Sequence, residues 1–542
     1  MQKMLCFLEI LRDKIIEFRS WKRNCLALSF GMLGVLALPP FLFLPLILVS
    51  LVVFNWTLDG ILIKTKDHSK VFVFLQSFLT GWCFGLGFFL GGLYWVYNSF
   101  FVDPEKFAWL SPFAVLVLSS GMALYIGFTA SFTCMFSRPG ISRLVNICIF
   151  WVVFELIRGW AFTGFPWNLL ATVWANTPQM TQIASILGVF GLSFITLLLA
   201  SSIAVLGHKE IGVRKRIIFS FSLFLIPVMV WGYGEVRLYY SQNQNVAGVL
   251  LRLVQPNINQ KDKWKPLLIN KHINTLLSLS TRESAKFSTS PTHIIWPETA
   301  TPFYLSKNKA AVELLEKISP KRGALITGSP RANLITNIEK RIWNSIHVIT
   351  SKEGIMDTYD KRHLVPFGEY VPFRQFLKLS KIVAGRTDFS PGIETISLKV
   401  PNAPKAIPTI CYEGIFQLKN PELVANRQVG WLLNLTNDAW FGDSSGPYQH
   451  LEATRFRALE HGLPLVRVAN TGLSAVIDPY GRTIVSSRLN EKTTIDSILP
   501  TKLAKGTIFS KYGNWTLVLL LLLFFSLLNF KTLKALVNRS NN

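Results

Sequence analysis

Charge is scarce in this chain of 542 residues, and acidic charge is scarcer than basic charge. Only 16% of the residues are charged and 50% are hydrophobic, with 56 Lys+Arg against 31 Asp+Glu. Soluble globular proteins usually carry about 25% charged residues, so the composition indicates a membrane protein with a substantial polar part. Many basic residues flank apolar segments, and the chain lacks zinc-finger spacing, an RNP-like motif and any long basic tract. We therefore expect no nucleic-acid partner.

Several motifs that would indicate a bound metal or cofactor are also absent. The chain has no His-Glu-x-x-His run, no Cys-x-x-Cys pair and neither of the common Gly-rich phosphate loops, so we expect no metal and no cofactor. Of the six cysteines, five lie in or beside apolar segments near the N-terminus, and Cys411 alone lies in the polar portion, residues 242–511. A free cysteine is usually a small buried hydrophobe, so the neighbours of Cys411 decide between packing and chemistry.

Eight apolar segments reach or approach the roughly 20 residues that a helix needs to span a bilayer. The first is short and is separated from the second by Pro39-Pro40; the eight are residues 25–38, 41–63, 71–97, 112–136, 144–162, 183–206, 217–233 and 515–530. With eight spans, the N-terminus and the most basic loops fall on one side, which the positive-inside rule assigns to the cytoplasm.

This topology predicts five parts. They are an amphipathic cytoplasmic N-terminus, a membrane domain of seven spans, a periplasmic catalytic domain, a C-terminal span and a cytoplasmic tail, at residues 1–24, 25–233, 234–513, 514–530 and 531–542. The N-terminal segment either lies on an anionic membrane surface or is the flank of the first span. Its apolar face contains Met4, Phe7, Leu8, Leu11, Ile15 and Phe18, and Arg12 is among the basic residues around that face.

Two features of the membrane part have a structural and a functional interpretation. Glu155 and Arg158 are three residues apart near the end of a predicted span. We expect them to pair with each other, although ionisable residues inside a membrane also mark functional sites. The loop at residues 162–168 (Phe-Thr-Gly-Phe-Pro-Trp-Asn) carries aromatic residues, which favour anchoring at the interface or a role on the side of the polar domain.

The polar region alternates β-rich runs with amphipathic segments, which indicates a layered α/β domain. Predicted strands are residues 246–254, 293–296, 324–327, 345–350, 406–411, 430–435, 465–468 and 473–478, and predicted helices are residues 265–279, 309–318 and 448–460.

Three short motifs in this region end in reactive side chains. Glu298 ends Ile-Ile-Trp-Pro-Glu, Lys361 lies in Tyr-Asp-Lys-Arg-His, and Cys411 ends a buried-looking strand and begins Cys-Tyr-Glu. Each residue alone is an ordinary buried thiol or surface charge. Together, a carboxylate, an ammonium and a thiol supply a base, an oxyanion stabiliser and a nucleophile, and Lys361 is expected to lower the thiol pKa. His363 could activate a cysteine in a papain-like manner, but the local signatures of that class are missing.

These motifs resemble the Glu-Lys-Cys triad of the nitrilase superfamily. The eight spans, the run at residues 363–372, the loop at residues 164–167 and the segment Asn-Asp-Ala-Trp-Phe-Gly at residues 437–442 resemble its membrane-embedded branch, the bacterial apolipoprotein N-acyltransferases. The resemblance implies an αββα sandwich on a multispan helical membrane domain. It implies Glu298 as base, Lys361 as oxyanion-stabilising lysine and Cys411 as nucleophile, with Trp264, Glu369, Tyr412 and Glu413 as supporting or substrate-binding residues. Asn168 stands where that family more often has a hydrophobic residue.

The implied reaction moves a fatty acyl chain from a phospholipid, through a Cys411 thioester, to the N-terminal α-amino group of diacylglyceryl-cysteine in an apolipoprotein. The implied location is the bacterial inner membrane, with a monomeric enzyme. Two other functions use the same residues differently. A membrane-tethered nitrilase-type amidohydrolase would share the triad, and a multispan ligand-binding or transport protein would need no reactive cysteine. Eight spans favour lipid substrates over the first, and sparse intramembrane charge disfavours transport.

Overall fold

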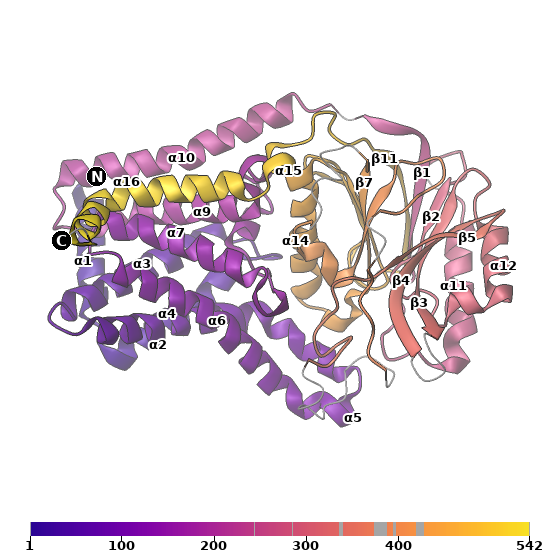
Figure 1. Cartoon of the computed structure of the whole chain (residues 1–542), viewed down its shortest axis with the longest axis horizontal. Coiled ribbons are helices and arrows are strands. Elements are labelled where there is room, and N and C mark those ends of the chain that lie inside the picture. The colour runs from indigo at the N-terminus through magenta and orange to yellow at the C-terminus, as the bar shows by residue number, and fades with distance from the viewer. Residues whose placement is uncertain are drawn as a thin grey trace. The chain divides into compact units, whose positions relative to one another are not determined.

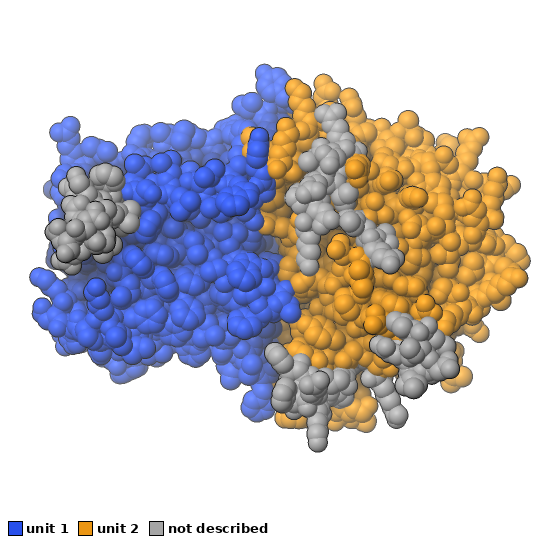
Figure 2. Space-filling view, viewed as in Figure 1, with its two compact units in different colours: residues 1–94, 112–240, 512–542 blue, residues 95–111, 241–511 orange. Residues whose placement is uncertain are grey.

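The computed structural model describes residues 2–242, 244–284, 286–334, 340–372, 387–393, 397–418 and 428–540. The chain forms two compact units (Figure 2). Unit 1 comprises Met1–Tyr94, Pro112–Tyr240 and Tyr512–Asn542, and unit 2 comprises Trp95–Ser111 and Ser241–Lys511.

Unit 1 is built from helices (Figure 1). Its longer helices are α1 (Gln2–Glu17), α2 (Ser20–Gly34), α3 (Leu44–Lys64), α4 (Lys70–Leu93), α6 (Ser111–Met135), α7 (Ile141–Arg158), α9 (Ala184–Ala204), α10 (Val213–Tyr239) and α16 (Trp515–Ser540). Shorter helical turns at η1 (Val35–Ala37), η4 (Ala161–Thr163), η5 (Leu170–Trp174), α8 (Pro178–Thr181) and η6 (Val205–Gly207) connect them.

A helix occupies each of the eight predicted spans. Among the described residues, five helical stretches are long and apolar enough to cross a bilayer: Leu44–Lys64, Lys70–Phe101, Pro104–Met135, Ala184–Gly207 and Val213–Tyr239. The other three fall short for different reasons. α2 has 15 residues, α7 carries Arg143, Glu155 and Arg158 within its 18 residues, and α16 has a shorter apolar stretch at Trp515–Leu528. The chain is thus a multispan helical membrane protein, and the count of eight spans stays a prediction.

The apolar face of the N-terminal helix α1 is only partly exposed, although it was expected to lie on a membrane surface or to flank the first span. Leu8, Leu11 and Ile15 pack into a cluster with residues of α3, α7 and η6, whereas Met4 and Phe7 are exposed. Arg12, expected among the surrounding basic residues, is fully buried and bonds Asp59 of α3 through Nε at 3.3 Å. Half of the predicted apolar face of α1 therefore packs against other helices of unit 1. The ion pair between Arg12 and the buried Asp59 holds α1 in this position.

The prediction that Glu155 and Arg158 pair with each other is wrong, because each side chain bonds other groups. Arg158 Nη1 donates to the carbonyl oxygens of Phe165 at 3.0 Å and Trp167 at 2.6 Å. Glu155 Oε1 accepts from the indole N–H of Trp151 and the backbone N–H of Leu170, both at 3.2 Å. Arg158 therefore binds the loop that follows α7, and Glu155 binds both that loop and Trp151 of its own helix.

Unit 2 contains two β-sheets. In the first, the strand order is β11-β1-β2-β3-β4-β5, formed by β1 (Asn245–Gln255), β2 (His293–Ile295), β3 (Ala324–Leu334), β4 (Lys340–Thr350), β5 (Gly354–Asp360) and β11 (Thr493–Pro500). In the second, the order is β10-β9-β8-β7-β6, formed by β6 (Ala406–Ile410), β7 (Trp431–Thr436), β8 (Leu465–Ala469), β9 (Ala475–Ile477) and β10 (Thr483–Ser486). The strands β1, β2 and β3 are parallel, as are β6, β7 and β8.

The two sheets are the inner layers of an αββα sandwich, with α11 (Ile269–Thr281) and α12 (Lys309–Ile318) outside the first sheet and α14 (Gly446–His461) beside the second (Figure 1). Alternation along each strand separates the layers. In β1, Leu251 and Leu253 face the core between the sheets, whereas Val254 joins the cluster beneath α11 and α12. A third cluster joins the second sheet to Leu451 and Ala458 of α14. The predicted αββα fold is confirmed.

All eight predicted strands overlap observed ones, and the predicted helix at residues 309–318 has the bounds of α12. Strands β5, β10 and β11 were not predicted, because their sequences mix polar and apolar residues and many of their positions are exposed or only partly buried. Cys411, placed in a strand, instead begins the short helix η9 (Cys411–Ile415).

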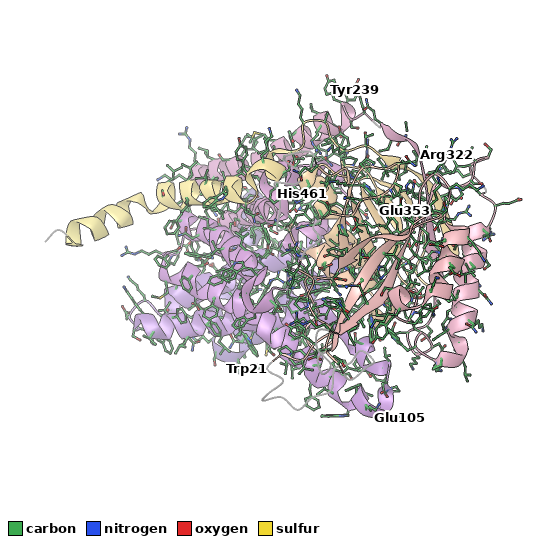
Figure 3. The ribbon with its side chains drawn as sticks, turned by 45° about the vertical axis from the view of Figure 1, so that its right-hand side comes forward. Trp21, Glu105, Tyr239, Arg322, Glu353 and His461 are labelled. Atoms are coloured by element: carbon green, nitrogen blue, oxygen red, sulfur yellow. The ribbon has the colours of Figure 1, made fainter. Side chains whose placement is uncertain are left out.

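One segment between two predicted spans belongs to unit 2. Residues Trp95–Ser111 were included in the predicted membrane domain, but they form η2 (Tyr94–Phe101), α5 (Pro104–Phe107) and η3 (Ala108–Leu110) against the loop after β7. Trp95 Nε1 donates to Gln449 Oε1 at 3.2 Å, and Asn98 Nδ2 donates to the carbonyl of Phe441 at 2.8 Å. Glu105, labelled in Figure 3, lies on the exposed side of the segment.

Candidate active site

Glu298, Lys361 and Cys411 all follow the carboxyl ends of strands in unit 2. Glu298 lies three residues beyond the end of β2, Lys361 directly follows β5, and Cys411 directly follows β6 in the other sheet. All three are buried, with exposed fractions of 8%, 1% and 8%. The charges of Glu298 and Lys361 both act on the Cys411 thiol. The structure therefore brings together the three groups that the motifs singled out.

The turn that carries Glu298 depends on a glycine in the next strand. Gly328 of β3 donates its N–H to the carbonyl of Pro297 at 3.2 Å. A Cβ at position 328 would lie 2.4 Å from the backbone nitrogen of Thr299 and 2.7 Å from Cα of Glu298. Only glycine permits this close approach, so β3 fixes the position of Glu298.

Cys411 occupies an unusual backbone conformation. Its φ is 52°, in the left-handed region that costs a non-glycine residue roughly 1–3 kcal/mol. Such strain persists only where surrounding contacts impose it. The sharp turn ends β6 and directs the side chain away from the path of the strand.

The net shift of the thiol pKa is opposite to the expectation. Burial, the largest cause, and the nearby Glu298 raise the pKa of the Cys411 thiol to about 12, although Lys361 acts in the lowering direction as predicted. The resting thiol is therefore protonated at neutral pH and depends on a base for activation. Burial also raises the pKa of Glu298, with Glu369 adding to the shift, which makes this carboxylate a stronger base.

Lys361 is held by a second carboxylate. Its Nζ lies 2.9 Å from Glu369 Oε2, which also accepts the backbone N–H of Val365 at 2.9 Å. Burial alone would lower the pKa of Lys361, but Glu369 and Glu298 outweigh it and raise the pKa above its ordinary value. Lys361 therefore carries a permanent positive charge in a site of low polarity, where it acts strongly on a neighbouring negative oxygen.

Asn344 of β4 was not predicted as a site residue. Its Nδ2 donates to Glu298 Oε1 at 2.8 Å and to Glu369 Oε1 at 3.1 Å, and its backbone carbonyl accepts the N–H of Lys361 at 2.8 Å. One asparagine thus connects both carboxylates and the lysine. Its position beside the predicted strand at residues 345–350 gave no signal, because other residues of β4, such as Ser345 and His347, are also polar and buried.

Glu413 supports the turn rather than the thiol directly. Its Oε1 accepts the backbone N–H groups of Arg362 at 2.7 Å and His363 at 2.9 Å, and its Oε2 accepts that of Ile410 at 2.8 Å. The Tyr359 hydroxyl donates to the same carboxylate at 2.9 Å. Glu413 therefore ties the segment after Lys361 to the strand before Cys411. The ring of His363 packs on Phe416, with centroids 4.0 Å apart.

The loop with Trp264 contributes a residue that the motifs did not single out. Lys263 is buried, and its Nζ donates to the backbone carbonyl of Glu298 at 2.9 Å. Burial lowers the pKa of Lys263 to about 8, against the opposing effects of Glu298 and Cys411. Within the described part of the chain, the buried indole N–H of Trp264 has no hydrogen-bond acceptor. Tyr412 packs against Phe416, with ring centroids 4.9 Å apart.

Two loops with aromatic residues differ in their surroundings. Phe441 is partly buried and packs on Trp95, with ring centroids 4.4 Å apart. In the loop at residues 367–373, Phe367 is 45% exposed, and Phe373 lies outside the described residues. In unit 1, Asn168 is buried at a positive φ of 52°, on the loop that Arg158 holds.

An αββα sandwich with an acid, a lysine and a cysteine at its strand ends is the arrangement expected of the carbon–nitrogen hydrolase class. Residues 250–506 match the family model described as carbon-nitrogen hydrolase. Residues 30–202 match the model described as apolipoprotein N-acyltransferase N-terminal domain.

Relatives that match over most of the chain identify the family within this class. An apolipoprotein N-acyltransferase of Rhodopseudomonas palustris is 36% identical over 520 residues, covering 92% of this chain and 93% of the relative. One from Bradyrhizobium diazoefficiens is 38% identical over 516 residues, with coverage of 92% and 93%. Among solved structures, an amidase from Nesterenkonia sp. AN1 aligns with 46% of this chain and 93% of its own, at 19% identity and a TM-score of 0.33. The chain belongs to the apolipoprotein N-acyltransferase family.

Proposed function

We propose that this protein transfers a fatty acyl chain from a phospholipid to the α-amino group of the diacylglyceryl-cysteine that begins an apolipoprotein. The observation that carries the proposal is the joint presence of a buried Glu–Lys–Cys cluster and a multispan helical unit in a chain that matches its family over 92% of its length. Both substrates are lipids, so a membrane-embedded enzyme meets them without a soluble carrier.

In the first half of the reaction, Cys411 Sγ attacks the ester carbonyl carbon of the phospholipid while its proton passes to Glu298. Lys361 donates a hydrogen bond to the negative oxygen of the tetrahedral intermediate. The carbon–oxygen bond then breaks, and the lysophospholipid leaves as an alcohol after it receives the proton from Glu298. The acyl chain remains on sulfur as a thioester.

In the second half, the neutral α-amine attacks the thioester carbonyl. Glu298 accepts the amine proton, the carbon–sulfur bond breaks, and the proton returns to sulfur as the amide forms. The raised pKa of Glu298 suits a group that accepts and returns a proton twice per cycle. Glu369 and Glu413 hold Lys361 and the Cys411 turn, and we assign Trp264 and Tyr412 to substrate contact.

We further propose that the enzyme is a monomer of the bacterial inner membrane with its catalytic unit, residues 234–513, in the periplasm. The basic loops at residues 64–70, 137–143 and 209–216 support this orientation by the positive-inside rule. Single cysteines introduced at Lys66 and at Glu105 of a cysteine-reduced variant should react oppositely with a membrane-impermeant maleimide in intact spheroplasts. Labelling of Lys66→Cys alone would reverse the assignment.

The function is tested by intact-protein mass spectrometry of membrane-purified enzyme. Wild type should carry a fatty-acyl mass increment that hydroxylamine removes, and Cys411→Ala should not. Cys134→Ala, which removes another buried free thiol, is the matched control and should keep the increment. An unmodified wild type after incubation with phospholipid would contradict the nucleophile assignment. Release of ammonia or an amine from a soluble amide by wild type, with no fatty-acyl increment, would favour the amidohydrolase alternative.

A further inference from the structure

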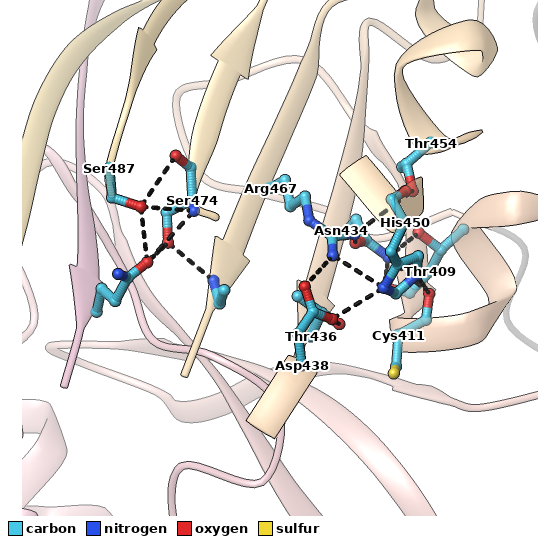
Figure 4. A network of polar contacts seen from close by, with 12 residues as sticks. Thr409, Cys411, Asn434, Thr436, Asp438, His450, Thr454, Arg467, Ser474 and Ser487 are labelled. Atoms are coloured by element: carbon cyan, nitrogen blue, oxygen red, sulfur yellow. Dashed lines mark hydrogen bonds and ion pairs between the residues drawn. The ribbon is translucent and has the colours of Figure 1, made fainter. Parts of the chain in front are cut away.

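A buried polar network lies behind the Cys411 turn and takes no part in the mechanism described above (Figure 4). Its central members are Asp438, which follows β7, His450 of α14 and Arg467 of β8, and each is at most 1% exposed. Arg467 Nη2 lies 2.7 Å from Asp438 Oδ2, and His450 Nδ1 lies 2.8 Å from Asp438 Oδ1. Three side chains from three elements thus form one hydrogen-bonded cluster around the Asp438–Arg467 ion pair.

The network ends on the main chain of the nucleophile. His450 Nε2 lies 3.2 Å from the carbonyl oxygen of Cys411. Asn434 Nδ2 lies 3.3 Å from the same oxygen, and Asn434 is itself oriented by Arg467 Nη1, which donates to its Oδ1 at 2.6 Å. Because a carbonyl oxygen only accepts, Nε2 of His450 carries the proton in this contact.

These contacts lie where Cys411 is strained. With a φ of 52°, the residue would relax to an ordinary conformation unless its peptide groups were held. The side chain of Thr436, which donates to Asp438 Oδ1 at 2.9 Å within the network, is also a hydrogen-bond partner of the Cys411 thiol. Two donors on the carbonyl side therefore fix the backbone, and the fixed backbone determines where the sulfur lies relative to Glu298 and Lys361.

The cluster is electrostatically stable around neutral pH. Burial would raise the pKa of Asp438, but Arg467 and His450 outweigh burial and lower this pKa to about 2. Asp438 therefore remains ionised and paired with Arg467. The second contact of His450 Nδ1, 3.0 Å from Arg467 Nη2, keeps the ring in one orientation.

We propose that His450, oriented by Asp438 and Arg467, is a positioning residue for the nucleophile, holding the Cys411 carbonyl so that the thiol is presented to the acyl donor. This rests on the proposed function for the identity of the donor. The geometry itself is independent of that identity, because it concerns only the presentation of the sulfur.

The test compares His450→Ala and His450→Gln in the purified full-length enzyme. We expect His450→Ala to lower kcat about tenfold, as for the loss of one well-placed hydrogen bond, with KM for phospholipid unchanged. His450→Gln should recover much of the loss, because its amide N–H reaches the position of Nε2 and also donates. The rate of Cys411 alkylation by iodoacetamide should fall in His450→Ala and recover in His450→Gln.

A buried histidine on the same helix provides the control. His461 packs against Phe509, with ring centroids 5.7 Å apart, and within the described residues its ring nitrogens make no hydrogen bond. His461→Ala should lower the melting temperature but leave kcat and the alkylation rate unchanged. Equal losses in His450→Ala and His450→Gln, or losses that follow the melting temperature across all three variants, would overturn the proposal. Alkylation needs no lipid and so reports on Cys411 separately from acyl transfer. If His450→Ala changes the alkylation rate while wild type transfers no acyl chain, only the proposed function is overturned.

Discussion

At the scale of single residues, Asn344 is the point where the acid and the lysine of the site are joined. Its Nδ2 bonds both Glu298 and Glu369, and the bond to Glu298 lowers the pKa of that carboxyl. Asn344→Leu keeps the shape and removes the bond, so the pKa of Glu298 should rise further.

The expected result is an acid limb of the pH profile of kcat/KM that moves to higher pH, with activity at neutral pH lower by roughly 10-fold or more, as for a hydrogen bond to a charged group worth about 1.5–3 kcal/mol. His347→Leu, a change at another buried polar residue of β4, should lower stability without moving the limb. An unmoved limb in Asn344→Leu would show that Asn344 does not act on Glu298.

The pKa of Cys411 makes a second prediction at this scale. Since burial and Glu298 raise the pKa of the thiol to about 12, only a small thiolate fraction exists at neutral pH without substrate. The rate of alkylation by iodoacetamide should therefore keep increasing with pH to at least pH 10. Below the pKa, the thiolate fraction rises about tenfold for each unit by which the pH increases. A plateau below pH 8, measured by mass spectrometry of the Cys411 peptide, would mean a thiolate that is already formed at rest.

At the scale of elements, the segment Trp95–Ser111 connects two apolar helices yet packs as part of the catalytic unit. Asn98 and Ser99 donate to the carbonyl oxygens of Phe441 and Trp440 at 2.8 and 3.0 Å, in the short helix η10 (Asp438–Phe441) that begins with the Asp438 of the network.

Asn98→Ala removes one of these bonds, each worth about 1 kcal/mol, and should loosen η10. We expect a moderate fall in kcat and faster cleavage by a protease in the segment after β7, measured by limited proteolysis with mass spectrometry. Glu105→Gln, on the exposed side of the same segment, should change neither. Unchanged cleavage in Asn98→Ala would mean that the segment does not hold η10.

The sequence was most informative for the buried, apolar strands, including β6 at the edge of the second sheet. Strands β2, β6 and β7 are almost wholly buried, so hydrophobicity alone locates them. β5, β10 and β11 lie toward the sheet edges, where one side of the strand is solvated and the pattern weakens. The left-handed turn at Cys411 could not be predicted, because it arises from contacts with Asn434 and His450 that lie 23 and 39 residues away in sequence.

At the scale of the whole molecule, buried ion pairs tie the N-terminal helix to the apolar helices. Asp59 of α3 bonds Arg12 of α1 at 3.3 Å and Arg143 of α7 at 2.6 Å, and all three side chains are fully buried. Sequence reasoning placed Arg12 on the outside, because its partners lie 47 or more positions away.

Removing the central carboxylate leaves two buried arginines without their common partner. Asp59→Asn should therefore destabilise the detergent-solubilised protein by roughly 3–5 kcal/mol, seen as a lower midpoint of thermal unfolding. Asp13→Asn disrupts the exposed pair with Lys209 at 2.7 Å, which is worth at most about 1 kcal/mol, and should have little effect. Equal midpoints for the two variants would contradict a structural role of the buried cluster.

The central claim is that one acyl chain passes through Cys411 on its way from phospholipid to lipoprotein. The most direct measurement is a chase: enzyme is charged with a labelled phospholipid acyl chain, freed of lipid, and mixed with a synthetic diacylglyceryl-cysteine peptide. Label should leave the protein and appear as an amide on the peptide N-terminus in equal amount, and Cys411→Ala should transfer none. Label that stays on the protein, or that is released as free fatty acid in the presence of the peptide, would contradict this claim.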